Sequence, residues 1–179
     1  MKFVRLTDAN DPMYSESLNL YKNSFPYHEL REDESQFCIM KNCEYHFCLI
    51  YDGDEFIGDI FYWETDDFIY VEHFCILNEK RNQNYGHRAL SSFGAGKTVI
   101  LEIDPPSDDI SIRRKGFYER CGFILNEFNH FHPPYHENCK PHFLKIMTRP
   151  GAIDKNMYDR FNSYLSNVVM KNAFKNVIR

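Results

Sequence analysis

Hydrophobic residues follow two different spacings along the chain. Alternating apolar and polar residues are typical of half-buried strands, and apolar residues repeated every three to four positions indicate amphipathic helices. Alternation and short apolar runs predict strands at residues 2–6, 45–51, 56–63, 68–77, 98–103, 123–131 and 143–148. The helical spacing predicts helices at residues 11–25, 33–42, 86–93, 108–121 and 154–174. This order of elements predicts one mixed α/β or α+β domain.

Turn residues make the three strands between residues 45 and 77 the clearest part of the pattern. Asp52-Gly53-Asp54 separates the first strand from the second, and Thr65-Asp66-Asp67 separates the second from the third. Both sequences favour hairpin turns. The strand at 98–103 reads TVILEI, which is almost continuously apolar. Such a run predicts a strand that is buried on both faces.

The first and last helices each have an apolar side. Asp11 is expected to be the N-cap of the first helix, with Pro12 in its first turn. Its apolar side consists of Met13, Leu18, Tyr21 and Phe25. The apolar side of the last helix consists of Met157, Phe161, Leu165, Val168 and Val169. We expect residues 151–179 to be an addition to a domain formed by residues 1–150, packed on that domain or on the second subunit of a homodimer.

Composition removes several classes of function. The formal net charge is −5, so the chain lacks the basic surface that nucleic-acid binding requires. Neither an apolar run near the ~18 residues of a membrane span nor a hydrophobic signal region is present. We therefore expect a cytoplasmic protein without nucleic-acid or membrane partners. The six cysteines form no CxxC pair and are expected to be reduced and mostly buried: Cys38, Cys43, Cys48, Cys75, Cys121 and Cys139.

Two stretches carry candidate chemistry. The first runs from the strand end at Ile76 through a polar loop to a helix that begins near Gly86. Backbone amides in such a loop, together with the start of a helix, form a cradle for an anion. Asn84 tolerates positive φ, and Gly86 allows close approach of the backbone. By itself the stretch slightly favours an ordinary strand-to-helix turn.

The second stretch is Phe117-Tyr118-Glu119-Arg120-Cys121-Gly122-Phe123. Tyr118 lies in the last turn of a predicted helix, Gly122 follows as a C-cap, and an aromatic strand begins after it. By itself this pattern favours Tyr118 as a half-buried packing residue.

Together, and in this order, the two stretches resemble the GNAT superfamily of acetyl-CoA-dependent N-acetyltransferases. The cofactor motif of that family is [Arg/Gln]-x-x-Gly-x-[Gly/Ala] after an apolar strand end. Arg81-x-x-Asn84-x-Gly86 is similar to it, with Asn84 in place of the usual glycine. Residues 117–123 resemble a later motif of the family, and the order of elements agrees over roughly residues 1–148. The insertion at residues 105–109 makes the start of the following helix uncertain.

The resemblance implies a fold and a co-substrate. The fold would be a single GNAT-like domain of the α+β type, with a mixed, mostly antiparallel central sheet and helices on both faces. A V-shaped splay would separate the strand ending at Ile76 from the strand ending at Ile103. Acetyl-CoA would bind in the V, with its pantetheine arm on the first strand and its pyrophosphate on the loop amides. The residues that would contact it are Phe74, Ile76, Arg81, Asn82, Asn84, Gly86 and His87.

The resemblance also implies direct attack of a primary amine on the thioester. An amine is largely protonated at neutral pH, so a base is needed, often acting through water. Glu72 is one candidate and is expected on the same strand face as Phe74 and Ile76. Glu102 is the other, because an acid in an apolar strand is costly unless it is paired or functional. A water chain without a single base is the third option, and Tyr118 matches the family position that protonates the departing thiolate.

The acceptor is less well defined by the sequence. In this fold the segments at residues 25–34 and 132–142 flank the acceptor site. Glu29, Tyr135 and His136 are the residues expected to contact the acceptor. Acidic and aromatic groups suit a cationic amine. A polyamine, an amino acid, an aminoglycoside and a peptide N-terminus all remain candidates.

Three other patterns carry less weight. Residues 91–98 resemble the end of a Walker A loop, but a strand is expected after them instead of the required helix. His130, His132, His136 and His142 have no recognised metal-ligand spacing, so no metal is expected. Cys121 is interpreted as a packing thiol. The alternative functions are a catalytically inactive acyl-CoA-binding sensor or scaffold and a His-rich metal-binding protein.

Overall fold

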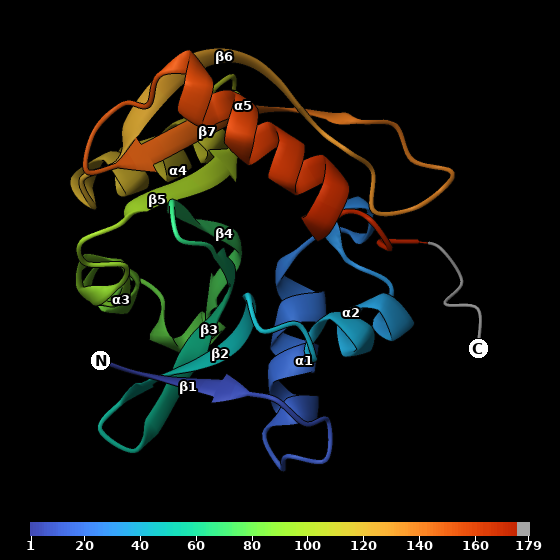
Figure 1. Ribbon diagram of the computed structural model, residues 1–179. Coiled ribbons are helices and arrows are strands. Elements are labelled where there is room, and N and C mark those ends of the chain that lie inside the picture. Colours follow the sequence, from blue (N-terminus) through green and yellow to red (C-terminus); the bar gives the residue numbers. More distant parts are fainter. Residues whose placement is uncertain (175–179) are drawn as a thin grey trace.

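A sheet of seven strands forms the centre of the molecule, with the strands in the order β1-β2-β3-β4-β5-β7-β6 (Figure 1). The computed structural model describes residues 1–174 of the chain. The strands are β1 Lys2–Leu6, β2 Tyr45–Asp52, β3 Glu55–Glu64, β4 Phe68–Ile76, β5 Thr98–Ile103, β6 Ile124–His132 and β7 His142–Arg149. The helices are α1 Tyr14–Ser24, α2 Asp33–Ile39, α3 Tyr85–Ser92, α4 Asp109–Arg120 and α5 Lys155–Tyr164, with shorter turns η1 Tyr27–Glu29, η2 Asn78–Lys80 and η3 Leu165–Val169.

Neighbouring strands are antiparallel in every pair except β4 and β5, which are parallel. The predicted α+β domain with a mixed, mostly antiparallel sheet is therefore confirmed. The strands at residues 2–6 and 98–103 have the predicted bounds, and the ends of the other strands lie within one residue of the prediction. Each strand of residues 1–174 belongs to this sheet, and alternation and turn residues predicted all of them.

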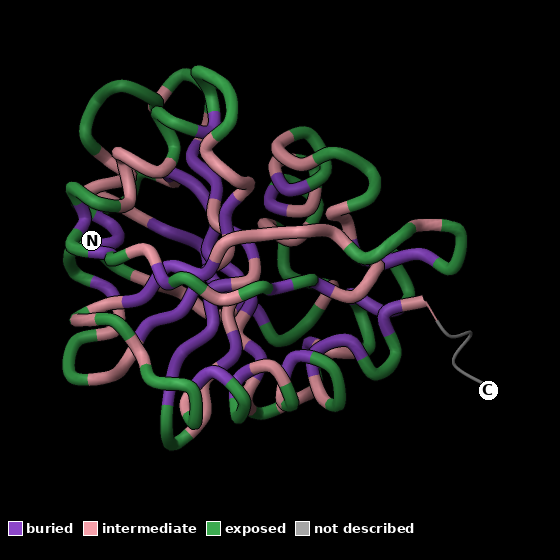
Figure 2. Tube along the Cα trace, turned by 90° about the horizontal axis from the view of Figure 1, so that it is seen from above, coloured by how far each residue is buried: buried purple, intermediate pink, exposed green. Residues whose placement is uncertain are grey.

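Helices cover both faces of the sheet, and each face has its own hydrophobic core. One core contains Tyr21 of α1 and Phe161 of α5. The other contains Ala89 and Leu90 of α3 and reaches Phe117 of α4. Figure 2 shows the interior strands as buried and the connecting loops as exposed. The sheet is thus the middle layer between two groups of helices, as the sequence predicts.

The start of the first helix was predicted wrongly. The helix begins at Tyr14, and the residue before it, Met13, makes no side-chain cap. Asp11 instead accepts a hydrogen bond at 2.8 Å from the backbone amide of Met13. An aspartate can close such a local turn two residues ahead, which competes with capping a helix. The predicted apolar side is nevertheless correct, because Tyr21 is buried and Leu18 packs against the same core.

The two central strands separate as predicted. β4 and β5 pair from Phe68 and Thr98 as far as Val71 and Leu101. Beyond that point β4 continues to Ile76 without pairing to β5. The splay leaves backbone groups on one edge of β4 free to bind another chain or a ligand.

A bulge in β4 changes the direction of the side chains at the splay. Phe61 of β3 pairs with His73 and Tyr62 pairs with Val71, so Glu72 is the extra residue. An extra residue interrupts the period of two by which side chains alternate between faces. Consequently Glu72 lies on the α1 side of the sheet, bonded to Trp63, whereas Phe74 and Ile76 pack on the α3 side. The prediction that all three share one face is wrong.

The C-terminal segment packs on the rest of the chain. Phe161, Leu165 and Val169 are buried in the core on the α1 side. The predicted continuous helix at 154–174 is shorter: α5 ends at Tyr164, and residues 165–169 form a single π-helical turn. A domain boundary at residue 150 stays a prediction, and residues 175–179 of the expected C-terminal unit lie outside the described part of the chain.

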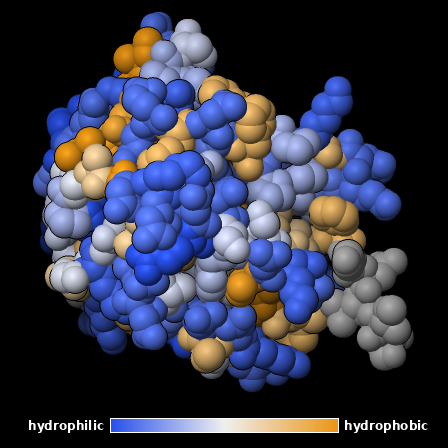
Figure 3. Space-filling model, turned by 45° about the horizontal axis from the view of Figure 1, so that its top comes forward, coloured by the Kyte–Doolittle hydropathy of each residue, from blue (hydrophilic) through white to orange (hydrophobic). Residues whose placement is uncertain are grey.

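The surface of the molecule carries few apolar groups on the face in Figure 3, and its cysteines are not paired. The face shown in Figure 3 is mostly hydrophilic, and its apolar side chains form small separate groups. No helix in the described residues has the length and apolarity needed to cross a membrane. All six cysteines are free, but only Cys48, Cys75 and Cys121 are buried. Cys38 and Cys43 are exposed, so the expectation of mostly buried thiols holds for half of the set.

Candidate active site

A cavity of about 1090 Å³ opens where β4 and β5 separate. Its walls come from the ends of these two strands, from α3 and α4, and from the segments near residues 24–29 and 132–144. The residues predicted from the sequence that line it are Glu29, Glu72, Phe74, Ile76, Arg81, Asn82, Asn84, Gly86, His87, Glu102, Tyr118 and Tyr135. Positions from most of the chain length therefore meet in one space.

The loop before α3 has the backbone of an anion site. Asn82 and Asn84 both adopt positive φ, at 61° and 66°. Asparagine is one of the few residue types other than glycine that enter this region readily. No backbone oxygen of the described residues accepts from the N–H groups of residues 82–87, so these donors are available at the start of α3. The Arg81 side chain donates to the carbonyl of Ile76 at 3.1 Å and ties the loop to the end of β4.

Gly86 lets α3 approach the opposite wall closely. A Cβ atom at this position would lie 3.2 Å from the ring of Phe117 in α4 and 3.7 Å from the side chain of Ile76. The first of these separations is tighter than an ordinary van der Waals contact. A larger side chain would therefore extend into the cavity or push the two helices apart.

Glu72 is held on every side. One oxygen, Oε1, accepts from Arg31 at 2.7 Å and from the Tyr135 hydroxyl at 2.9 Å, and Oε2 accepts from the indole of Trp63 at 2.7 Å. The side chain is 1% exposed. Burial acts to raise the pKa of this carboxyl, but the charges of Arg31 and His73 and the bond from Trp63 together lower the pKa to about 2. Glu72 is therefore a weak base with no free oxygen.

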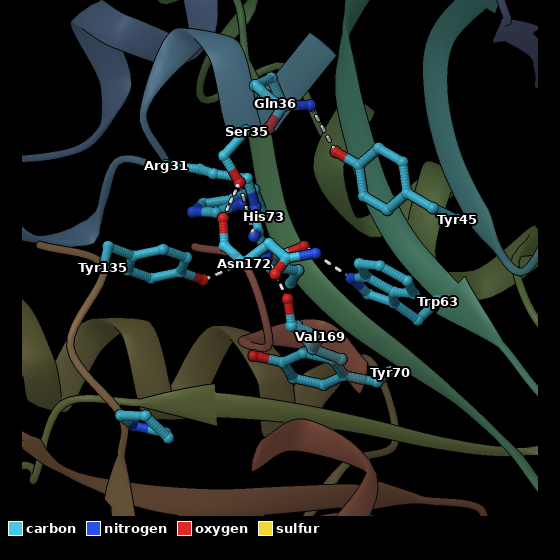
Figure 4. Close-up of polar contacts among 12 residues, drawn as sticks. Arg31, Ser35, Gln36, Tyr45, Trp63, Tyr70, His73, Tyr135, Val169 and Asn172 are labelled. Carbon is cyan, nitrogen blue, oxygen red and sulfur yellow. Dashed lines mark hydrogen bonds and ion pairs between the residues drawn. The ribbon is translucent and has the colours of Figure 1, made fainter. Parts of the chain in front are cut away.

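Arg31 links Glu72 to the C-terminal segment. Figure 4 shows Arg31 beside Val169 and Asn172 of that segment. Its guanidinium is fully buried and also donates to the carbonyl of Val169 at 3.0 Å and to the Ser35 hydroxyl at 3.3 Å. The same hydroxyl donates to the carbonyl of Asn172 at 2.8 Å. The turn after α5 thus helps to position the bulged end of β4.

Glu102 lies on the other arm of the V in a different network. Its Oε2 accepts from the Tyr70 hydroxyl at 2.5 Å, and its Oε1 is hydrogen-bonded to Nε2 of His130. Nδ1 of His130 lies 3.1 Å from the Tyr158 hydroxyl. Burial acts to raise the pKa of Glu102, but His132 and His130 outweigh it and hold the pKa below its usual value.

His132 completes this network at the cavity wall. Its Nδ1 lies 2.6 Å from the carbonyl of Pro133, which can only accept, so Nδ1 carries a proton. Its Nε2 is buried without a hydrogen-bond partner among the described residues, and it lies 3.8 Å from Oε2 of Glu102. The ring is fixed by stacking on Tyr135 with centroids 4.9 Å apart. The separation is too long for a direct hydrogen bond, and it leaves room for a donor that bonds to both acceptor atoms.

Tyr118 faces the same cavity from the end of α4. Its ring packs edge-on against Phe117 and Phe123, with centroids 5.1 Å and 5.8 Å apart. Burial raises the pKa of Tyr118 to about 12, although the charge of Arg114 opposes the shift. The hydroxyl therefore keeps its proton at neutral pH and is a hydrogen-bond donor.

The fold that surrounds this cavity is also found in a known protein. Searches against protein-family models and curated proteins found no match. A solved structure from Bacteroides thetaiotaomicron, an acetyltransferase assigned to the GNAT family, has a TM-score of 0.89 and 31% sequence identity to this chain. The alignment covers 95% of this chain and 98% of that one. The chain belongs to the GNAT family.

More distant solved structures share the fold. Arabidopsis thaliana Naa50, solved with the bisubstrate analogue CoA-Ac-MVNAL, has a TM-score of 0.56 at 14% identity and covers 84% of this chain and 98% of its own. The aminoglycoside 6'-N-acetyltransferase from Enterococcus faecium has a TM-score of 0.54 at 17% identity, covering 86% of this chain and all of its own. At these identities the likeness concerns the fold alone.

One predicted residue of this GNAT protein lies outside the cavity lining. His136 stacks on Tyr27 with centroids 4.0 Å apart, and its Nε2 lies 2.9 Å from the carbonyl of Tyr27. Its Nδ1 is 3.4 Å from a carboxylate oxygen of Glu32. His136 therefore joins the two segments that flank the cavity, and its predicted contact with the acceptor gains no support from this position.

Two residues of the GNAT site could not be found from the sequence. Arg31 sits in a charged connection between helices and gave no periodic signal, although it is the fully buried partner of Glu72. His132 was predicted only as part of a possible metal pattern and as the start of the segment 132–142 beside the acceptor, without a role of its own. His132 ends β6, and β7 lies between β6 and the strand β5 that carries Glu102, so no local pattern brings the two residues together.

Proposed function

We propose that this GNAT protein is an N-acetyltransferase that moves the acetyl group of acetyl-CoA to a primary amine. The observation that carries the proposal is the single cavity at the splay, which joins the amide cradle to Tyr118 and Glu102. In the reaction the amine nitrogen attacks the thioester carbonyl directly. A C–N bond forms, the C–S bond breaks, and the products are an amide and the CoA thiol.

The cofactor side of the cavity suits acetyl-CoA. A pyrophosphate needs donors and positive charge, and the free amides of residues 82–87 provide the donors. Lys80, Arg81, Arg113 and Arg120 line the same cavity and provide the charge. The unpaired edge of β4 beyond Val71 would hold the pantetheine arm near Phe74 and Ile76.

Glu102 is the better of the two candidate bases. A group that takes a proton needs a free lone pair and a pKa suited to the task. All the contacts of Glu72 hold it as a carboxylate, with a pKa of about 2. Glu102 also has a lowered pKa and one hydrogen-bond partner on each oxygen. Its Oε2 differs in facing the unpartnered Nε2 of His132 across 3.8 Å, and both residues line the cavity. We infer that the amine gives its proton to Oε2 of Glu102 or to Nε2 of His132, directly or through one water, while Glu72 positions Arg31 and Tyr135.

Tyr118 would complete the reaction at the sulfur. Negative charge develops on the thiolate as the C–S bond breaks. A tyrosine that keeps its proton can donate a hydrogen bond to that charge, and this stabilises the transition state. The acceptor side carries Glu29 and Tyr135, so a cationic or primary amine suits it.

Two measurements on purified protein test this function. Calorimetry should show binding of CoA, and a panel of polyamines, amino acids, aminoglycosides and peptides should show amine-dependent thiol release from acetyl-CoA. Gly86→Glu should abolish CoA binding, because the new carboxylate would extend into the phosphate cradle beside Phe117. Gly151→Glu is the matched control, since a Cβ there meets no atom within 4 Å. CoA binding without turnover across the whole panel would favour the alternative, an inactive acyl-CoA-binding module.

A further inference from the structure

Three potential metal ligands meet at the acceptor side of the cavity. Each residue of this cluster offers one ligand atom, and these three atoms lie within 4.8 Å of one another: a ring nitrogen of His28, a carboxylate oxygen of Glu29 and a ring nitrogen of His142. His28 Nε2 is 3.6 Å from Oε1 of Glu29, and the rings of His28 and His142 have centroids 5.4 Å apart. His28 and Glu29 belong to η1, and His142 begins β7. The cluster therefore spans two separate segments of the cavity wall.

The turn that carries two of these ligands is held from both sides. The carbonyl of Tyr27 contacts His136, whose ring also stacks on that of Tyr27. The carbonyl of Glu29 lies 2.9 Å from Nε2 of His73. Such contacts fix the backbone of the ligands before any ion binds, which lowers the entropic cost of binding.

The charges around the cluster are mixed. Asp104, at the end of β5, places a carboxylate oxygen 3.4 Å from Nε2 of His142. Arg114 pairs with the same carboxylate at 2.6 Å, so the aspartate is shared between the cluster and an arginine. Asp104 therefore helps to orient the ring of His142, and its carboxylate is close enough to serve as a fourth ligand.

We propose that His28, Glu29 and His142 form a binding site for a divalent transition-metal ion, with Zn²⁺ as the best match. Two imidazoles and a carboxylate are a ligand set that Zn²⁺ uses, with water in the fourth position. Bonds of about 2.0–2.2 Å place neighbouring ligand atoms roughly 3.4 Å apart. The separations in the cluster reach this arrangement through small side-chain rotations, which are permitted because His28 is exposed and Glu29 and His142 are only half-buried.

An ion at this place would tie η1 to the start of β7. Both segments line the cavity on the side assigned to the acceptor, so the ion would narrow the route of an amine to the thioester. It would also neutralise Glu29, which is expected to attract a cationic amine. Inhibition of acetyl transfer by Zn²⁺ is the consequence; this part rests on the proposed function, whereas binding of the ion does not.

Metal binding is tested without any co-substrate. Titration of the wild-type protein with Zn²⁺ in a calorimeter, and with Co²⁺ in an absorption spectrometer, should show one site. His142→Ala should weaken binding by at least about 100-fold, because loss of even an outer partner of a metal ligand costs 10–100-fold. Glu29→Gln should weaken it as well. His46→Ala is the matched control: His46 also faces a carboxylate, Glu64 at 3.8 Å, but outside the cavity.

The outcomes test the metal site and its inhibition of acetyl transfer separately. One-to-one binding that is lost in His142→Ala and kept in His46→Ala supports the site. Unchanged affinity in His142→Ala overturns it, and so does a thiolate-to-cobalt charge-transfer band, which would assign the ion to a cysteine. If Zn²⁺ binds at this site but leaves acetyl transfer unaffected, the site stands and its inhibitory role is wrong. If no amine is acetylated, the equilibrium titrations still decide the metal site.

Discussion

Replacing Glu72 by glutamine should destabilise the protein strongly, because the change leaves Arg31 as a buried charge without its partner. Glu72 and Arg31 are 1% and 0% exposed and lie 2.7 Å apart. Breaking such a buried pair from one side costs about 3–5 kcal/mol. For a chain of 179 residues this corresponds to a fall in Tm of roughly 6–20 °C.

The same pair gives a pH dependence with a definite sign. The pKa of Glu72 is about 2 in the folded protein, against a usual value of 4.5. A depressed pKa adds stability above the unfolded value, and this stability is lost as the pH falls through the folded value. The difference amounts to about 3 kcal/mol in total, of which about 2 kcal/mol is lost between pH 6 and pH 3. Glu72→Gln lacks this contribution, so its stability should change by that much less over the same range.

Urea unfolding of both proteins at a series of pH values measures this difference. Arg31→Met combined with Glu72→Gln is the control, because removing both charges should recover part of the stability that the single change loses. If Glu72→Gln matches the wild type in stability and in pH dependence, the carboxylate is not held as the structure shows. Glu72 would then become the stronger candidate for the base.

Two further predictions concern the base and the C-terminal segment. Glu102→Gln should reduce turnover at neutral pH by roughly 10²–10⁴. This loss should become smaller as the pH rises, because the amine then deprotonates without a base. A loss that does not change with pH would mean that Glu102 has a packing role only. Phe161→Ala should lower the free energy of unfolding by about 3–5 kcal/mol, because the ring is fully buried. Phe131 is exposed, so Phe131→Ala should change the free energy of unfolding by less than about 0.5 kcal/mol. Equal effects of the two substitutions in urea unfolding would mean that α5 is a loose appendage.

Local sequence signals were enough for most of the fold. The strand at 98–103 was found with its bounds because a six-residue apolar run has few other stable placements than a fully buried strand. The hairpins followed from Asp-Gly and Thr-Asp-Asp turns. The cofactor residues and Tyr118 were predicted from the resemblance of the two motif stretches to the GNAT superfamily, and they line one cavity.

The remaining features depend on contacts that no local pattern encodes. The bulge at Glu72 inserts a residue without any change in composition, so strict alternation placed Glu72 on the wrong face. The pairing of Arg31 with Glu72 joins segments far apart in the chain. His142 and Glu29 are far apart in the chain and lie close together in the folded protein. For Asp11 the sequence allowed both a helix cap and a local turn, and the turn formed.

Turnover of Tyr118→Phe is the most direct test of the proposed function. With an acceptor taken from the amine panel, wild-type protein should release CoA thiol only when the amine is present and should yield the N-acetylated amine. Tyr118→Phe should keep its affinity for CoA and lose turnover by roughly 10²–10⁴, since only the donor to the thiolate is removed. Tyr85→Phe, which changes another tyrosine of the same cavity on the cofactor side, should keep its turnover. Full turnover by Tyr118→Phe, with chemistry limiting the rate, would contradict the assigned active site.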